Sequence, residues 1–398
     1  MPPDPATHLF IARCLRGIEW ILAAEITAAG ASIVSVEHRQ VLFNMIVLSP
    51  DQLQFGTADD VFVHVGELSD IAHTRDSLDK VSAGMESLDW EHALLLLQRM
   101  HSAATPESQH PVHQWNKFTV VASFLGKQNF NRFELQAAVG NTIHTQLNLE
   151  FHEKLDSKSQ LGALTVRLHL VDGTAQLSLR VFERPLHRRS YKQFAETGTL
   201  HPPLAFAMGM LAGLEEYSKI LDPFCGMGTI PIEIKTRYPN THVTGVDIDA
   251  DRIDKSRLNA DTANVSIDWR QADAGDLPGE LGQFDRVISN PPWGNTVKAQ
   301  GELENALPSH FFHNLHTLTT SDARIVLLIN DADLLDSQQL VECGFTIRSA
   351  VKVSVFGQQP TLMLITKHKQ NADTFNIDSA YGYYLAVAHQ YASDTAAV

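Results

Sequence analysis

The sequence predicts an α/β fold for the C-terminal half of the chain and α+β structure before it. Two observations carry this expectation. From residue 202 onward, short apolar runs alternate with segments of helical periodicity, and a glycine-rich turn follows the first run. That alternation is typical of a mostly parallel sheet with helices on both faces. Before residue 202, strands and helices come in mixed order, and Asp172-Gly173 is a strong hairpin signal between two strands.

The elements follow from local periodicity, because strands alternate every second residue and helices recur every three or four. The front 60 residues give a strand at 8–14, a helix at 17–29 and strands at 32–36 and 41–47. The second α+β region gives helices at 91–100 and 132–146, and strands at 117–124, 164–171 and 174–181. The last region gives strands at 219–223, 242–247, 265–270, 285–290 and 324–330, with helices at 229–236, 251–260 and 309–319. A final hairpin, 345–355 with 361–366, adds an antiparallel edge.

The composition of the chain limits the classes of protein to which it can belong. The chain of 398 residues is long enough for two or three domains. No run of about 18 apolar residues predicts a membrane span, the N-terminus does not resemble a signal peptide, and three scattered cysteines indicate a reducing compartment. We therefore expect a cytoplasmic protein.

Charge is uneven along the chain. The formal net charge is −15, but residues 101–192 hold eleven Lys and Arg against seven Asp and Glu. This is the one net-basic segment, and it favours a modest phosphate-binding face there. The linker at 182–195 is the most basic short stretch, and a solvated loop is the ordinary interpretation of such a run. Its position beside the basic region makes RNA contact the alternative, through these side chains and two near residue 130: Lys127, Arg132, Arg184, Arg188, Arg189 and Lys192.

A glycine-rich turn connects the strand at 219–223 to the helix that follows it. It reads Asp222, Pro223, Phe224, Cys225, Gly226, Met227, Gly228, Thr229. The C-terminal ends of strands are where open α/β sheets bind ligands. The two glycines let the backbone approach a ligand, the helix N-terminus offers free N–H groups, and the acidic group suits an ammonium. A tight structural turn is the alternative interpretation.

Acidic residues follow the next two strands of this region. Asp247, followed by Ile248, ends the strand at 242–247, where a carboxylate can accept both hydroxyls of a ribose. Asp249 is equally suited to be the N-cap of the next helix. Asp273, followed by Ala274, could accept a hydrogen bond from an adenine amino group, and an ordinary polar loop is as good an interpretation.

The tetrapeptide Asn290-Pro291-Pro292-Trp293 ends the fourth strand. An amide side chain and the carbonyl of Pro291 can accept the two hydrogens of an exocyclic amine, which localises its lone pair on nitrogen. The ring of Trp293 can stack on the base. Catalysis would then consist mainly of orientation and desolvation. The pattern predicts methyl transfer to an amine of a nucleobase, and a structural Pro-Pro turn is the alternative.

Other chemistry is not indicated. The histidine pairs at 110/113 and 313/316 lack companions at metal-ligand spacing, so no metal is expected. Cys225 has no paired base, which argues against a covalent intermediate.

Taken together, these motifs resemble class I S-adenosylmethionine-dependent methyltransferases with a Rossmann-like sheet. The front half resembles the THUMP-domain RNA methyltransferases, in FIARCLRGIEWILAAE at 10–25, TADDVFV at 57–63 and LHRRSYK at 186–192. The resemblance covers roughly residues 8–370 and is nearest to the branch that methylates guanine N2 in tRNA. Ser190 and Trp293 depart from the family pattern, which commonly has glycine and Tyr or Phe there.

The resemblance implies a ferredoxin-like domain at 1–57, a THUMP domain at 58–181, a linker at 182–201, a methyltransferase domain at 202–370 and a tail at 371–398. It implies that the glycine-rich turn, Asp247 and Asp273 surround S-adenosylmethionine, and that residues 290–293 hold a flipped base. We expect tRNA as partner, no membrane, and a monomer. Two alternatives stay open: adenine-N6 methylation of RNA or DNA, and an RNA-binding protein with an inactive methyltransferase domain.

Overall fold

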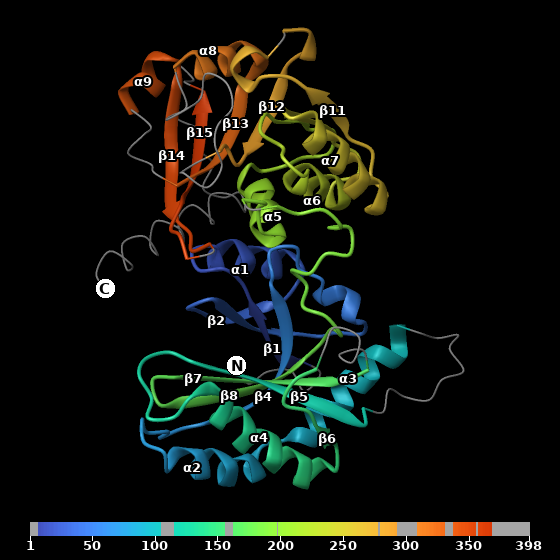
Figure 1. The fold of residues 1–398 in the computed structure, drawn as a ribbon, viewed down its shortest axis with the longest axis vertical. Helices are drawn as coiled ribbons and strands as arrows, with labels where there is room; N and C mark the ends of the chain where they lie inside the picture. Colours follow the sequence, from blue (N-terminus) through green and yellow to red (C-terminus); the bar gives the residue numbers. More distant parts are fainter. Residues whose placement is uncertain are drawn as a thin grey trace. The chain divides into compact units, whose positions relative to one another are not determined.

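The chain folds into two compact units in a computed structural model (Figure 1). Unit 1 comprises residues 1–13 and 26–186, and unit 2 comprises residues 14–25 and 187–398. The structure describes residues 7–104, 115–155, 162–196, 198–277, 279–292, 309–330, 337–355 and 357–367. The helix α1 (Glu19–Ala28) contains the boundary between the units.

Unit 1 is built on one eight-stranded sheet with the order β2-β3-β1-β4-β8-β7-β5-β6. Its strands are β1 (His8–Arg13), β2 (Ser32–Glu37), β3 (Gln40–Met45), β4 (Asp60–Leu68), β5 (Lys117–Phe124), β6 (Glu150–Phe151), β7 (Leu164–Val171) and β8 (Thr174–Arg180). Its helices are α2 (Ser77–Gly84), α3 (Trp90–Ala104) and α4 (Arg132–Leu147). The neighbours are antiparallel except where β5 pairs with β6 and β7.

The two faces of this sheet differ in chemistry. Figure 1 shows α2 and α4 along one face, where alternate side chains such as Val166, Leu177 and Val120 are almost fully buried. Because successive residues of a strand point to opposite faces, Arg167 and Arg180 lie on the other face. The helices therefore cover an apolar face, and the second face carries arginines.

Unit 2 has a seven-stranded sheet with the order β11-β10-β9-β12-β13-β15-β14. Its strands are β9 (Lys219–Asp222), β10 (His242–Asp247), β11 (Asp268–Gln271), β12 (Phe284–Ser289), β13 (Thr319–Ile329), β14 (Phe345–Lys352) and β15 (Thr361–Lys367). Its other helices are α5 (Pro202–Leu211), α6 (Thr229–Arg237), α7 (Ala250–Thr262), α8 (Ser309–Leu318) and α9 (Ser337–Glu342). β9 to β13 run parallel, and β15 is antiparallel to both β13 and β14.

The strand order reverses direction at β9. β10 and β11 continue on one side of it, whereas β12 and β13 continue on the other. An apolar cluster joins α8 and α9 to one face, with Phe311, Phe312 and Phe345 at its centre. Open α/β sheets bind ligands at such a reversal, which here lies at the carboxyl ends of β9 and β12.

The predicted fold class is confirmed, and most elements match within a few residues. Five of the described helices and strands carry no sequence prediction: β4, β6, α2, α5 and α9. α5 (Pro202–Leu211) is apolar on all sides and almost wholly buried, so it has no helical periodicity to read. β11 begins at Asp268 rather than at residue 265.

The five-part division of the chain stays a prediction. The expected boundary at 57/58 falls between β3 and β4, which belong to the same continuous sheet. Among the described residues, no helix is long and apolar enough to cross a membrane.

Candidate active site

The glycine-rich turn lies at the carboxyl end of β9, at the reversal point of the unit 2 sheet. Cys225 donates its backbone N–H to the carbonyl of Val246 at 2.8 Å, which fastens the turn to β10. Phe224 packs on Phe311 of α8, with ring centroids 5.5 Å apart. Pro223 and Thr229 are buried, and Thr229 begins α6. The predicted strand, turn and helix are therefore present in that order.

The two glycines of the turn differ in their surroundings. Gly226 and Gly228 have φ of +51° and +81°, a backbone conformation that favours glycine. A Cβ on Gly228 would lie 2.7 Å from the ring of Trp269. A Cβ on Gly226 would meet no atom within 4 Å. Gly228 thus packs against the fold, whereas the described residues leave open space beside Gly226.

Asp222 is 1% exposed and ends β9. Its Oδ1 accepts hydrogen bonds from Ser289 Oγ at 2.5 Å and from the backbone N–H of Phe224 at 3.2 Å. Its Oδ2 has no hydrogen-bond donor within the described part of the chain. Burial raises the pKa of Asp222 to about 7, and the nearby Asp247 adds to the rise. A cationic ligand would stabilise the ionised form, so the site fits an ammonium group.

Asp247 ends β10 and is 6% exposed. Its Oδ2 accepts from Gly226 N and its Oδ1 from Asp249 N, both at 2.9 Å. Burial raises its pKa, although these donors oppose the shift. Each oxygen keeps a lone pair for a hydroxyl of a ligand. Asp249 accepts from Asp251 N and is the N-cap of α7, so the capping interpretation of this residue is confirmed.

Three further predicted contacts lie at the same sheet edge. Ile248 follows Asp247 and is 38% exposed, which is unusual for an isoleucine beside a buried strand. Asp273 caps a short 3-10 helix by accepting from Gly275 N at 2.8 Å, and Ala274 beside it is buried. An apolar side chain and an acidic group at strand ends are suited to a nucleoside base.

Asn290 follows directly on β12, the strand next to β9. It is half-buried, as is Pro292, and Pro291 is buried. Trp293 lies outside the described residues. The register of β12 against β9 brings Ser289 to Asp222, so the tetrapeptide begins one residue from the hydrogen bond that holds the acidic group. Sequence reasoning missed Ser289; a hydroxyl at the end of a strand, directly before Asn290, was the available signal.

Cys225 is buried, so its thiol is not suited to act as a nucleophile. The side chain is 6% exposed, and desolvation raises the pKa of its thiol well above the ordinary value. A protonated thiol is a poor nucleophile. The expectation that no covalent intermediate forms on Cys225 agrees with this environment.

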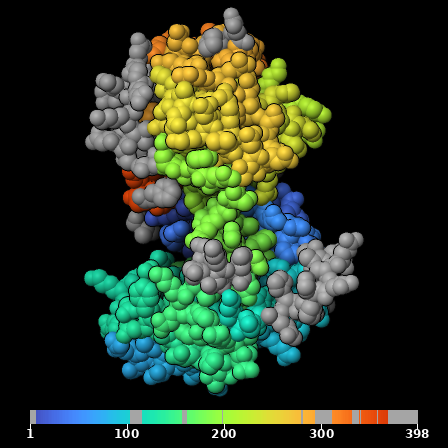
Figure 2. Space-filling model, turned by 45° about the vertical axis from the view of Figure 1, so that its right-hand side comes forward, coloured from blue at the N-terminus to red at the C-terminus, as the bar shows by residue number. Residues whose placement is uncertain are grey.

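The basic residues predicted to bind RNA do not share one environment. Lys127 and Arg132 are exposed before and at the start of α4, and the Arg132 guanidinium lies 4.8 Å from the ring centroid of Phe133. Arg184 and Arg188 are exposed. Figure 2 shows that the teal and green part of the chain, which includes α4, forms much of the visible face of unit 1.

Arg189 and Lys192 are held within unit 2. Arg189 donates from Nε and Nη2 to the carboxylate of Glu233 at 3.0 Å, and Tyr191 donates to the same group at 2.8 Å. Lys192 donates to the carbonyl of Leu200 at 2.9 Å, and burial lowers the pKa of Lys192 to about 8. These contacts give both cations a structural role, and their predicted contact with RNA stays a prediction.

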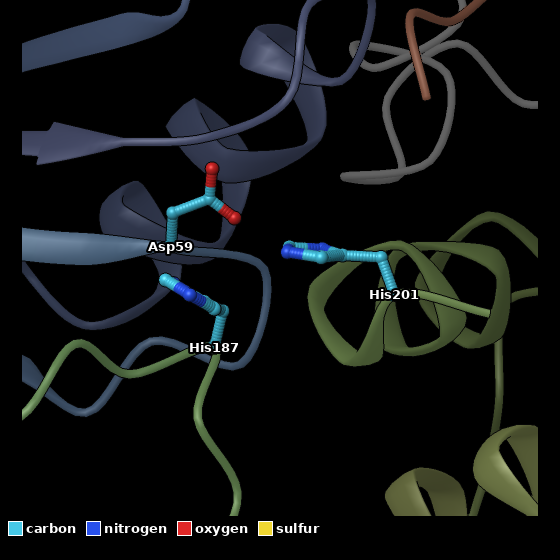
Figure 3. A group of neighbouring side chains, drawn as sticks. All are labelled: Asp59, His187 and His201. Carbon is cyan, nitrogen blue, oxygen red and sulfur yellow. The ribbon is translucent and has the colours of Figure 1, made fainter. Parts of the chain in front are cut away.

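Figure 3 draws the side chains of Asp59, His187 and His201. His187 and His201 both belong to unit 2, where their rings stack with centroids 5.4 Å apart. Asp59 belongs to unit 1, where it lies 3.9 Å from the guanidinium of Arg39. The absence of a metal stays a prediction from the sequence.

Comparison with known proteins now decides the family. Residues 189–354 match a model described as an RMKL-like methyltransferase domain. A tRNA (guanine(6)-N2)-methyltransferase of Thermus thermophilus is 31% identical over 252 residues, which cover 63% of this chain and 72% of that protein. The chain belongs to the tRNA guanine-N2 methyltransferase family. Its unit 2 is therefore a class I, S-adenosylmethionine-dependent methyltransferase, and the predicted family, enzyme class and cofactor are confirmed.

Two solved structures and another relative are also similar to this chain. The crystal structure of TrmN from Thermus thermophilus superposes with a TM-score of 0.69 at 25% identity, over 91% of this chain and 100% of that one. A U6 snRNA (guanine-N(2))-methyltransferase of Bos taurus is 28% identical over 195 residues, 48% of this chain and 37% of that protein. SMU.472, a methyltransferase solved with SAH, shares the fold with a TM-score of 0.65 at 17% identity.

Proposed function

We propose that this methyltransferase transfers a methyl group to the exocyclic N2 amine of a guanosine in tRNA, at position 6 of the acceptor stem. The observation that best supports methyl transfer is the position of Asn290-Pro291-Pro292, directly after β12. Ser289, just before it, is hydrogen-bonded to Asp222. The Thermus thermophilus relative, which matches over 63% of the chain, is named for guanine 6 of tRNA, which supports this position.

The acidic residues at the ends of β9, β10 and β11 would each hold a different part of the cofactor. When bound, S-adenosylmethionine supplies an electrophilic methyl group on a sulfonium. Asp222 Oδ2 would pair with its ammonium group, and the carboxylate of Asp247 would accept the ribose hydroxyls. Asp273 and Ile248 would contact the adenine. Buried carboxylates fixed by backbone donors orient a ligand without reorganising.

Asn290 and Pro291 would position the amine. The amide oxygen and the backbone carbonyl accept its two hydrogens, which turns the nitrogen lone pair away from the ring and toward the methyl group. Holding both reactants in line supplies most of the rate. No general base is needed before transfer, because the amine becomes acidic once methylated and then releases its proton.

Unit 1 would bind the tRNA. The ferredoxin-like domain at 1–57, the THUMP domain at 58–181 and the linker at 182–201 are proposed to hold the tRNA. Lys127, Arg132, Arg184 and Arg188 are exposed cations that would contact phosphates. A cytoplasmic location and a monomeric state belong to the same proposal.

Nucleoside mass spectrometry of tRNA from cells with and without this protein tests the function. We expect N2-methylguanosine to fall in its absence and to return when the gene is restored. Loss of N6-methyladenosine instead would show that the methylated base is adenine and not guanine. An unchanged profile would reject tRNA methylation.

A further inference from the structure

The second face of the unit 1 sheet gathers arginines in one place. We define the arginine face as the side chains on the face opposite α2 and α4: Arg13, Asp60, Phe62, Ser123, Arg167, His169 and Arg180. They come from five adjacent strands, β1, β4, β8, β7 and β5. Because adjacent strands of one sheet hold these groups close together, their charges act on one another.

The carboxylate of the arginine face, Asp60, pairs with Arg180. Arg180 donates from Nε to Asp60 Oδ2 at 2.7 Å and from Nη1 to Thr165 Oγ1 at 2.9 Å. The Arg180 and Asp60 side chains are 11% and 9% exposed. Asp60 therefore pairs directly with Arg180, and it acts on Arg167 only through space, where its charge raises the pKa of Arg167.

Arg167 is left with a neutral partner. Its Nη2 donates to Ser123 Oγ at 3.1 Å, and its guanidinium lies 5.8 Å from the ring centroid of Phe62. No carboxylate in the described part of the chain forms an ion pair with it. Burial, and then the positive charge of Arg13, lower the pKa of Arg167 to about 9. A guanidinium has five N–H donors, so several remain for a ligand.

The hydroxyl that holds Arg167 is itself oriented. A guanidinium can only donate, so Ser123 Oγ accepts from Arg167, and the same oxygen shares a hydrogen bond with His169 Nδ1 at 2.9 Å. Burial and the charge of Arg13 lower the pKa of His169 to about 3, which keeps the ring neutral. Arg167 is therefore fixed in place before any ligand arrives.

A fixed guanidinium that forms no ion pair with a described residue and has Arg13 and Arg180 nearby is suited to an anion that brings two or more acceptor oxygens. We propose that Arg167, with Arg13 and Arg180 beside it, binds a phosphate group of the RNA substrate on the arginine face. The inference rests on the proposed function, because it takes the phosphate from RNA. Free inorganic phosphate has the same chemistry and must be separated from it by experiment.

The test measures tRNA binding by the full-length protein across a range of salt concentrations. Arg167→Gln should raise the Kd for tRNA roughly tenfold or more, the loss of one charge-assisted hydrogen bond, and reduce the salt slope by about one. Arg167→Lys should restore part of the affinity and the slope. Arg75→Gln is the matched control, because Arg75 pairs with Glu134 of α4 on the helical side of the sheet. It should change neither quantity.

A second variant guards against misfolding of the first. Val121 is the cross-strand neighbour of Arg167 on β5 and is 40% exposed. Val121→Glu gives Arg167 a carboxylate within the protein, so the thermal midpoint should hold or rise while tRNA affinity falls. Val34→Glu, at a valine 53% exposed on β2, should leave affinity unchanged.

The outcomes separate the possibilities. Normal tRNA affinity and salt slope in both Arg167→Gln and Val121→Glu would overturn the inference. If millimolar phosphate then still raises the thermal midpoint of the wild type and not of Arg167→Gln, the site serves free phosphate. If the wild type itself binds no tRNA, the proposed function fails first, and this site with it.

Discussion

Ser289 Oγ lies 2.5 Å from Asp222 Oδ1 and joins the strand that ends in Asn290 to the carboxylate at the start of the glycine-rich turn. The two groups are 67 residues apart in sequence and both are almost fully buried. One hydrogen bond thus connects the residues proposed to hold the amine with those proposed to hold the cofactor.

Removal of this hydrogen bond should weaken cofactor binding. In Ser289→Ala, Asp222 loses the donor that most opposes its raised pKa, so less of it is ionised at pH 7. A hydrogen bond to a charged group contributes about 1.5–3 kcal/mol, so the Kd for S-adenosylmethionine should rise roughly tenfold or more by calorimetry. Ser256→Ala removes another fully buried hydroxyl, within α7, and should leave the Kd unchanged. Equal effects of the two variants would show general destabilisation.

The raised pKa of Asp222 predicts a specific dependence on pH. The pKa is about 7 in the folded chain against an ordinary value of 3.8, so the native state holds a proton that the unfolded state releases. Stability of the free protein should therefore fall as pH rises from about 4 to 7, by a few degrees in the thermal midpoint. Asp222→Asn should flatten this part of the profile.

Cofactor binding should show the opposite trend over the same window. An ammonium group favours ionised Asp222, so affinity for S-adenosylmethionine should increase as pH rises through 7, with release of a proton at lower pH. Calorimetry in buffers of different ionisation enthalpy measures that proton. If the wild type and Asp222→Asn release the same amount, Asp222 is not the group that pairs with the ammonium.

The two glycines of the turn should respond differently to alanine. Both have positive φ, but only at Gly228 would the new Cβ collide with Trp269. Gly228→Ala should cost roughly 2–4 kcal/mol from strain and overpacking together. Gly226→Ala should cost about 1–2 kcal/mol in stability. Thermal denaturation ranks them, and a larger loss at Gly226 would contradict the structure.

Neighbouring linker arginines should separate in their effects. Arg188 is exposed, so Arg188→Ala should weaken tRNA binding and lower the salt slope by about one without changing stability. Arg189→Ala leaves Glu233 buried without its cation and should destabilise unit 2 by about 3–5 kcal/mol. Denaturation and tRNA titration of both variants provide the check, since a stable Arg189→Ala with weak tRNA binding would restore a direct role for Arg189.

Sequence reasoning reached the reaction because its signals are local. Asp222, Asp247 and Asn290 each follow a strand directly, and parallel strands bring their carboxyl ends to one sheet edge whatever the loops between them. The same reasoning could not separate Arg188 from Arg189, since only packing shows that Glu233 on α6 faces one of them. It also missed the arginine face, because Arg13, Arg167 and Arg180 become neighbours only through strand pairing across distant parts of the chain.

The measurement that tests the central claim most directly is methylation of a tRNA transcript by the purified protein, followed by nucleoside mass spectrometry. With isotopically labelled S-adenosylmethionine, the label should appear in N2-methylguanosine. It should be lost when guanosine 6 is replaced by adenosine. Asn290→Ala should bind S-adenosylmethionine as tightly as the wild type yet transfer no label. Label in N6-methyladenosine, or undiminished transfer by Asn290→Ala, would contradict the account.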